Sequence, residues 1–492
     1  MWARALAGCV ALGVGTAAAL ASSPSPLAPQ LAMLPRIDAA ARASLGGDPD
    51  WMQRRYDAAR DLAESTRRVV VPKGCDRLQE ALVILAEAEI AVTEAFDRLR
   101  PWRALHRRAE AARRRVEGIR PRCAAGGVTA PADAVPALSL PGPGEVFFGH
   151  VAGPAPARST RVLINVNGAR AATAAVSGGR FDVRAAVRHG PALVEALFLN
   201  DAGEQVGVAV SRDAFALPPL ATKAPAKPRR DPALTARLAA AARAFSGYSS
   251  IRIERLGTGT VAEWNGAARF PAASTVKLAV MIEAARRHGL GRGSPVLYDV
   301  GQAAEWSSNL AANRLFGIVG RGDAARGRTV AERRLRSLGA TSSTYPGEYR
   351  VGTSSNAAPS QPPLGTTRVT TARDLASIMR AIHLAAIGRR AGLDATGLRP
   401  ATARALLRAL VDSDAGGDNV GLVGPYLPAK TPVAQKNGWL SDSRSTAAIV
   451  YDDDGPAILV ILTFRSGGLG LAQAQSLGAS ATRIALTRSR GP

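Results

Sequence analysis

Hydrophobic residues recur at helical spacing in two consecutive stretches near the N-terminus. The first stretch has intervals of three, four and seven residues, at Leu78, Leu82, Leu85, Val92, Phe96 and Leu99. After Arg100-Pro101 the pattern resumes at Trp102, Leu105, Ala109, Ala112, Val116 and Ile119. Such spacing predicts amphipathic helices, and the proline between them ends the first one. We therefore expect an antiparallel α-helical hairpin within residues 36–123.

The pattern changes to short strands further along the chain. Residues 124–143 are rich in Ala, Pro and Gly, which is typical of a linker. Over residues 144–217, stretches such as "TRVLINVNG" and "ALVEALFLN" alternate with Gly, Asn-Gly and Asp-Ala-Gly turns. Evenly spaced strands predict a small β-sandwich, which resembles the immunoglobulin-like accessory modules of bacterial surface proteins. A second linker, Pro-rich and basic, is expected at residues 218–232.

Residues 233–492 combine both kinds of pattern. The segment "STVKLAVMIEAARR" has helical spacing, and "STAAIVYDDDGPAILVILT" contains two strand-like runs around an Asp-rich turn. This segment is therefore expected to be of mixed α and β structure. A chain of 492 residues is long enough for two or three domains.

The balance of charge is strongly basic, with 63 Lys and Arg against 39 Asp and Glu. A net charge of +24 is compatible with an anionic cell-envelope surface or with nucleic acid. The arginines are scattered, however, and no basic segment is interleaved with aromatic residues, so we expect no nucleic-acid partner. An anionic envelope surface stays open as a partner, and the protein is expected to be a monomer.

The first residues have the pattern of an export signal. Met1–Ala21 has one early charge and then an apolar run that ends in A-L-A. This predicts a cleaved signal peptide, and hence a secreted or envelope-associated protein. The mature chain would keep Cys75 and Cys123, and an even pair in an oxidising compartment favours a disulfide. The predicted helical hairpin would bring its two open ends, which carry Cys75 and Cys123, close together. The alternative is that both cysteines are buried free thiols.

Ser274 and Lys277 stand three residues apart at the predicted start of a helix. Pro271 suits the approach to this helix, and an i, i+3 pair shares one helix face. A serine hydroxyl becomes a nucleophile when a base stands beside it, and an amine with a depressed pKa is such a base. The helix N-terminus would add backbone N–H groups near a developing oxyanion. S-x-x-K alone is nevertheless a weak signal, because surface helices also contain it.

Two further motifs follow in the chain. "SSN" at residues 307–309 opens an Ala-rich helical stretch, and "KNG" at residues 436–438 precedes strand-like residues. Together the three motifs resemble S-x-x-K, S-D-N and K-T-G of the serine β-lactamase and penicillin-binding family, most of all the class A β-lactamases. The resemblance covers residues 233–492. It implies an α+β β-lactamase-like domain, with an antiparallel sheet and a helical subdomain, and an acyl-serine mechanism.

The resemblance also implies a role for each matching residue. Ser274 would be the nucleophile and Lys277 its base, and Ser307 would relay a proton toward the leaving nitrogen. Asn309 would bind the substrate amide, and Lys436 would supply positive charge for Ser307 and for a substrate carboxylate. The other residues that the resemblance places at the substrate are Asn437, Gly438, Trp439 and Arg444.

Three of these positions carry a more specific expectation. The oxyanion would be bound by the backbone N–H groups of Ser274 and Trp439. Arg444 would anchor a carboxylate, although an exposed arginine without function is the alternative. Asn437 replaces the threonine of K-T-G, and its amide cannot reproduce the geometry of a hydroxyl. Ser308 replaces the aspartate of S-D-N, whose role in the family is mainly structural.

The interval between the first two motifs is shorter than in typical class A enzymes, which implies a trimmed helical part and a more open cleft. Class A enzymes also carry E-x-x-L-N, whose glutamate activates the hydrolytic water. The matching interval here lacks that motif, and its only carboxylate is Glu348. We therefore keep Glu348 as a candidate catalytic residue, against the simpler alternative of a solvated loop residue paired with Arg350.

Other chemistries find little support in the sequence. The histidines form no H-E-x-x-H motif or Cys/His cluster, so neither a metal site nor a cofactor is expected. The substrate would be a β-lactam or a D-alanyl peptide of peptidoglycan. The alternative is a non-hydrolytic envelope protein that keeps the fold as a binding module and uses its N-terminal domains as spacers.

Overall fold

The computed structural model forms two compact units. It describes residues 27–43, 50–69, 71, 75–97, 101–119, 140–141, 144–217, 228–291, 293–349, 367–412 and 421–486. The first unit comprises the described residues of 1–134, 308–314 and 349–354, and the second those of 135–307, 315–348 and 355–492. The predicted signal peptide, the first linker's residues up to 139 and Cys123 lie outside the described residues. Export and the Cys75–Cys123 disulfide therefore stay predictions.

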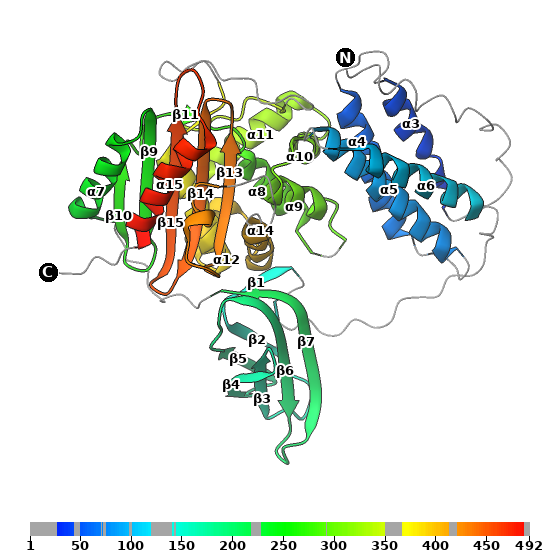
Figure 1. Ribbon diagram of the computed structural model, residues 1–492. Helices are drawn as coiled ribbons and strands as arrows, with labels where there is room; N and C mark the ends of the chain where they lie inside the picture. The colour runs from blue at the N-terminus through cyan, green and yellow to red at the C-terminus, as the bar shows by residue number, and fades with distance from the viewer. Residues whose placement is uncertain are drawn as a thin grey trace. The chain divides into compact units, whose positions relative to one another are not determined.

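The first unit consists of helices. They are α2 (Ala28–Leu31), α3 (Leu34–Ala43), α4 (Trp51–Arg68), α5 (Asp76–Asp97) and α6 (Arg103–Ile119) (Figure 1). Helices α5 and α6 form where the hydrophobic spacing predicts them and pack on each other. Among the spaced residues Leu78, Leu82 and Val92 are fully buried. The pattern missed α3 and α4, which pack together, while α4 also packs on α5.

Paired charges lie inside this helical unit. Arg55 of α4 donates to the buried Glu89 of α5 at 3.0 Å, and Arg113 of α6 approaches the same carboxylate at 3.3 Å. Burial alone would raise the pKa of Glu89, but the two guanidiniums lower it below its ordinary value. Arg113 also pairs with Asp38 of α3. The helices are thus joined by ion pairs as well as by apolar contacts.

The second unit begins with seven strands. They are β1 (Glu145–Phe147), β2 (His150–Pro154), β3 (Arg161–Val166), β4 (Ala169–Ala175), β5 (Arg180–Arg184), β6 (Gly190–Leu199) and β7 (Gln205–Ala216). One sheet has the order β1-β7-β6-β3-β4, and β2 pairs with β5 separately. Both sheets contribute to one apolar core, with Val151 and Phe181 from the small sheet and Ile164 and Phe198 from the large one. The likeness to immunoglobulin modules stays a prediction.

A six-stranded sheet follows, with the order β13-β14-β15-β9-β10-β8. Its strands are β8 (Arg229–Arg230), β9 (Tyr248–Arg255), β10 (Thr260–Trp264), β13 (Val433–Trp439), β14 (Ser443–Asp452) and β15 (Gly455–Phe464). All neighbours are antiparallel except β8 and β10. The sheet thus starts at Arg229, inside the stretch expected to be a linker, because the backbone there pairs with β10. Strand β13 is an edge strand.

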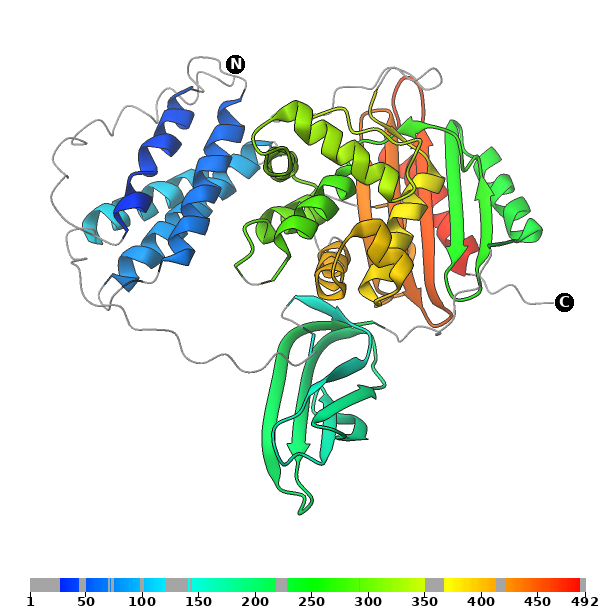
Figure 2. The ribbon, with the colours of Figure 1, turned by 180° about the vertical axis from the view of Figure 1, so that it is seen from behind.

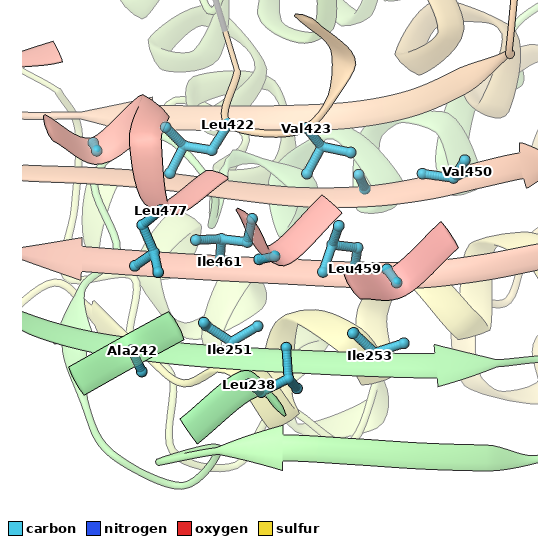
Figure 3. Close-up of a cluster of buried hydrophobic side chains, with 14 of the residues drawn as sticks. Leu238, Ala242, Ile251, Ile253, Leu422, Val423, Val450, Leu459, Ile461 and Leu477 are labelled. Carbon is cyan, nitrogen blue, oxygen red and sulfur yellow. The ribbon is translucent and has the colours of Figure 1, made fainter. Parts of the chain in front are cut away.

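Helices cover both faces of this sheet. Helices α7 (Pro232–Arg243) and α15 (Leu471–Leu486) lie on one face, where Leu238 and Leu477 pack on Ile251 and Ile461 (Figure 3). Helix α12 (Ala372–Ala386) packs on β9, β14 and β15 from the other face (Figure 2). Strands β14 and β15 are buried almost throughout, as strands covered on both faces must be. Residues 233–492 thus have the α+β arrangement of an antiparallel sheet with helices that the sequence predicts.

The remaining helices surround α8 (Lys277–His288). They are α9 (Leu297–Glu305), α10 (Asn309–Gly320), α11 (Ala324–Ser337), α13 (Arg390–Thr396) and α14 (Pro400–Asp412). Helix α8 is buried from Lys277 to Ala285. Near its C-terminal end, Glu283 accepts hydrogen bonds from Arg286, Arg287 and Arg334 of α11 at 2.7–2.8 Å. No helix among the described residues is long and apolar enough to cross a membrane.

Candidate active site

Ser274 lies in a tight turn that leads into α8, and not inside the helix as expected. The helix begins at Lys277. The Lys277 N–H bonds to the Ser274 carbonyl at 3.2 Å, and the Thr275 N–H bonds to Ala272 at 3.0 Å. These are i to i+3 bonds, the 3₁₀ pattern, in which residues three apart stand nearly one above the other. The turn therefore keeps Ser274 and Lys277 on one side, as the motif requires.

The turn is held by the segment that leads into it. Before it, Phe270–Pro271 forms the short strand β11, which pairs with β12 (Val369–Thr370). The Ala272 N–H then bonds to the Arg368 carbonyl at 3.0 Å. Ala273 adopts a positive φ of 45°, which is costly for a residue with a Cβ. The fold thus maintains a strained residue immediately before Ser274, as is common at functional sites.

Two lysines from distant parts of the chain converge on Ser307. Lys277 is fully buried and donates from Nζ to the Ser307 carbonyl at 2.6 Å. Lys436 of β13 is also fully buried and donates to the Ser307 hydroxyl at 2.7 Å. Ser307 itself has a φ of 57°, in the left-handed region that serine rarely adopts. The structure therefore brings together one residue from each of the three motifs.

Burial changes the protonation of Lys436. Its ammonium lies in the interior, where it also donates to the Asn437 carbonyl at 2.8 Å. Desolvation disfavours the charged form and lowers the pKa of Lys436 to about 7. Near neutral pH this amine can thus both give and take a proton. The hydroxyl with which it could exchange that proton is that of Ser307.

The glycine of the third motif is required by a close approach of two backbones. A Cβ at position 438 would lie 2.9 Å from the Ser274 nitrogen and 3.1 Å from the Ala272 oxygen. Only glycine allows β13 to pass so near the turn. The Ser274 N–H has no hydrogen-bond acceptor among the described residues, and Trp439 follows directly on the edge strand. This placement fits the expectation that the Ser274 and Trp439 N–H groups bind an oxyanion.

Asn437 is placed differently from the expectation. Side chains alternate along β13, so Asn437 points to the opposite sheet face from Gly438. Its side-chain oxygen accepts from the Thr446 hydroxyl of β14 at 2.8 Å, and that hydroxyl accepts from the Leu422 N–H at 2.8 Å. Asn437 is 2% exposed. It thus ties the edge strand to its neighbour, and Thr446, which no sequence motif marks, is its partner.

Trp439 and Arg444 form a pair at the end of the β13–β14 hairpin. They are opposite each other in the register, and the Arg444 guanidinium lies 5.5 Å from the centre of the Trp439 ring. Trp439 is 48% exposed. Arg444 also donates to the carbonyls of Leu440 and Ser443, and burial lowers its pKa below the ordinary value. The guanidinium is therefore held in place by the hairpin and its aromatic neighbour.

The residues after Ser307 open α10. The Ser308 hydroxyl accepts the Ala311 N–H at 3.2 Å, as an N-cap side chain does. Serine and aspartate are both good N-caps, so this contact explains how serine can stand in place of the aspartate of S-D-N. Asn309 is the first residue of α10.

Glu348 is an exposed loop residue. Its carbonyl accepts from Arg368 at 3.1 Å, while Arg350 lies outside the described residues. A second carboxylate of the same region, Asp374, is buried and accepts from the Ser343 hydroxyl at 2.7 Å. Burial raises the pKa of Asp374. Within the described part of the chain no three His, Cys, Asp or Glu side chains group as a metal site would require.

The C-terminal half of the chain resembles known proteins. Residues 233–295 and 302–488 match the sequence model of the beta-lactamase enzyme family. A β-lactamase from Sphaerobacter thermophilus aligns with 51% of this chain and 95% of its own, at 21% identity and a TM-score of 0.40. An ancestral class A β-lactamase aligns with 51% and 98%, at 20% identity and a TM-score of 0.40.

The structure described as PBP-A aligns with 54% of this chain and 98% of its own, at 17% identity and a TM-score of 0.42. No curated protein sequence matches significantly. The residues that match the family model make up just over half of the chain. The protein belongs to the beta-lactamase enzyme family.

Proposed function

We propose that the protein is a serine hydrolase that forms an acyl-enzyme at Ser274 with a β-lactam or a related D-alanyl peptide. One observation carries the proposal: Lys277 and Lys436, from two motifs, both donate to Ser307 of the third. Two buried amines around one strained serine cost stability. Such a cost is typical of a site kept for chemistry.

The proposed acylation follows from these contacts. Lys277 takes the proton of the Ser274 hydroxyl as its oxygen attacks the carbonyl carbon of the substrate. The developing oxyanion is bound by the N–H groups of Ser274 and Trp439. When the carbon–nitrogen bond breaks, Ser307 gives its proton to the leaving nitrogen and receives one from Lys436. A carboxylate on the substrate would be bound near Arg444.

The second half-reaction distinguishes two outcomes. An acyl-serine ester persists unless a water is deprotonated beside it, and Glu348 is exposed on its loop. We therefore propose slow deacylation, so that β-lactams are trapped before they are hydrolysed. Penicillin-binding behaviour toward D-alanyl peptides is the second candidate, and the same exposed Glu348 favours it. Export by the N-terminal signal would place either activity in the cell envelope.

Labelling with a fluorescent penicillin, followed by intact mass and peptide mapping over time, tests the proposal. We expect one adduct on Ser274, which disappears in Ser274→Ala. Glu348→Gln then separates the alternatives: turnover falls by about 10²-fold if Glu348 is the base. Unchanged turnover assigns deacylation to other groups. An adduct at another residue, or no adduct with any acyl donor, would disprove the proposal.

A further inference from the structure

Arg314 of α10 is a buried cation surrounded by the carboxylates of one N-terminal helix. Its side chain is 10% exposed and lies 2.8 Å from Asp61 and 3.6 Å from both Asp57 and Glu64. All three acids belong to α4. Spacings of four and three residues place them on one face of that helix. These residues belong to the same compact unit, since residues 308–314 are part of the helical unit.

Further hydrogen bonds accompany the ion pairs. The Gln53 side chain of α4 donates to the Leu310 carbonyl at 3.2 Å, and Arg314 donates to the Asp57 carbonyl at 3.4 Å. Asn313 exchanges two hydrogen bonds of 2.6 Å with the backbone of Tyr349. The first turns of α10 are thus held by hydrogen bonds with α4 and with the Tyr349 backbone. A helical spacer with no further task would not need them.

The held segment begins one residue after Ser307. Ser307 adopts a left-handed backbone, and such strain persists only where the surroundings impose it. On one side Lys277 binds the Ser307 carbonyl. On the other side the chain enters α10. The direction of this helix depends on the Ser308 N-cap and on the hydrogen bonds and ion pairs with α4. A change in the direction of α10 would therefore rotate the Ser307 hydroxyl.

We propose that Arg314 is a positioning residue for the hydrolase: its ion pairs with Asp57, Asp61 and Glu64 fix α10 so that Ser307 keeps its reactive conformation. The N-terminal helices are then part of the working enzyme. The inference rests on the proposed acylation of Ser274 for its kinetic test. Its structural consequence, a fixed α10, can be measured without any substrate.

The test compares Arg314→Gln with Arg113→Gln in the full chain. Arg113 is the matched control, because its ion pairs are with Asp38 of α3 and Glu89 of α5 rather than with α10. We expect Arg314→Gln to slow the acylation step about 10-fold to 100-fold, since small misplacements of a reacting group have effects of this size. The apparent dissociation constant for the acyl donor should change little, and Arg113→Gln should acylate at the wild-type rate.

A charge reversal sharpens the test. Arg314→Asp should acylate more slowly than Arg314→Gln, and adding Asp61→Arg should recover part of the rate. If Arg314 had a purely structural role, Arg314→Gln and Arg314→Asp would lower the melting temperature, and adding Asp61→Arg would not restore the acylation rate. Wild-type acylation by a folded Arg314→Gln, or equal slowing by Arg113→Gln, would overturn the inference.

Hydrogen exchange separates this inference from the proposed function. Amides of residues 308–314 should exchange faster in Arg314→Gln than in the wild type, whether or not an acyl donor reacts. If the wild type forms no adduct, the proposed function fails. The hydrogen-exchange rates of residues 308–314 then test whether Arg314 fixes α10. Unchanged exchange in residues 308–314 would overturn it in either case.

Discussion

Lys436 and Glu283 are both buried ionisable groups within residues 233–492, but their neighbours differ. Lys436 is bound by a hydroxyl and a carbonyl, and its pKa is lowered to about 7. Glu283 is bound by three guanidiniums, and hydrogen bonds from these outweigh burial and lower its pKa to about 2. Burial therefore moves Lys436 toward its neutral form, whereas paired charges hold Glu283 in its ionised form.

The difference separates a site suited to the proposed proton transfer from a structural one. A group with a pKa near neutrality can exchange a proton during a reaction. A saturated carboxylate cannot, but it joins α8 to α11 through Arg334. Lys436 shares the Ser307 contact with Lys277 at the start of α8, whereas Glu283 lies near the end of the same helix. The helix therefore joins the candidate active site to a set of paired charges. Substitutions at the two ends should accordingly affect different properties.

Lys277→Ala should have the largest effect, and mainly on chemistry. Removal of a general base slows acylation by about 10²–10⁴-fold. Loss of a desolvated amine offsets part of the cost of the cavity that the side chain leaves, so the melting temperature should change much less than the acylation rate. Stopped-flow acylation and thermal unfolding of the same preparation measure the two properties. An unchanged acylation rate would remove Lys277 from the mechanism.

Glu283→Gln should do the opposite. Three guanidiniums lose their carboxylate, and breaking a buried pair in this way costs about 3 kcal/mol of unfolding free energy, the lower end for such sites, since Arg286 and Arg287 are partly exposed. Acylation by the folded fraction should stay at the wild-type rate. Denaturant unfolding measures the loss.

The pH dependence sharpens this prediction. The folded-state pKa of Glu283 lies below the ordinary value, so its stabilisation is present above about pH 4.5 and disappears as the pH falls through about 2. The difference between wild type and Glu283→Gln should shrink over that window. A constant difference would show that the effect is not electrostatic.

Lys436→Met tests the lowered pKa of Lys436 through the pH dependence of the unfolding free energy. The pKa of Lys436 is about 7 in the folded protein and 10.5 as the ordinary value, so the unfolded chain binds more protons between them. Wild-type stability should therefore rise with pH from about 7 to 10.5, by at most about 1.4 kcal/mol per pH unit. The variant should lack this rise. Unfolding curves at several pH values, wild type against variant, decide the point.

His383, a third buried group, tests the acid side of the stability curve. Its ring nitrogen lies 3.0 Å from the Tyr451 hydroxyl, and burial lowers its pKa to about 3. Because the unfolded chain gains a proton near pH 6.5, stability should fall as the pH drops from 6.5 toward 3. His383→Gln should flatten this part of the curve. An equal slope in both proteins would assign the acid sensitivity to other groups.

The sequence by itself determined the family and supplied the residues proposed for the site. Ser274, Lys277, Ser307 and Lys436 were proposed because a nucleophile, its base and a relay would need fixed residue types at short spacings within each motif. The helical periods of α5 and α6 were also legible, since an amphipathic helix repeats every three or four residues. Each of these signals is local, so no knowledge of the folded chain was needed.

The tertiary structure alone decided what the motifs touch. Asn437 points to Thr446 because strand alternation turns it away from Gly438, and the spacing within K-N-G does not reveal the neighbouring strand. The pKa of Lys436 depends on the depth of burial, which many segments create together. Arg314 meets three acids some 250 residues earlier in the chain. Pairings between such distant positions arise from packing, and no local pattern encodes them.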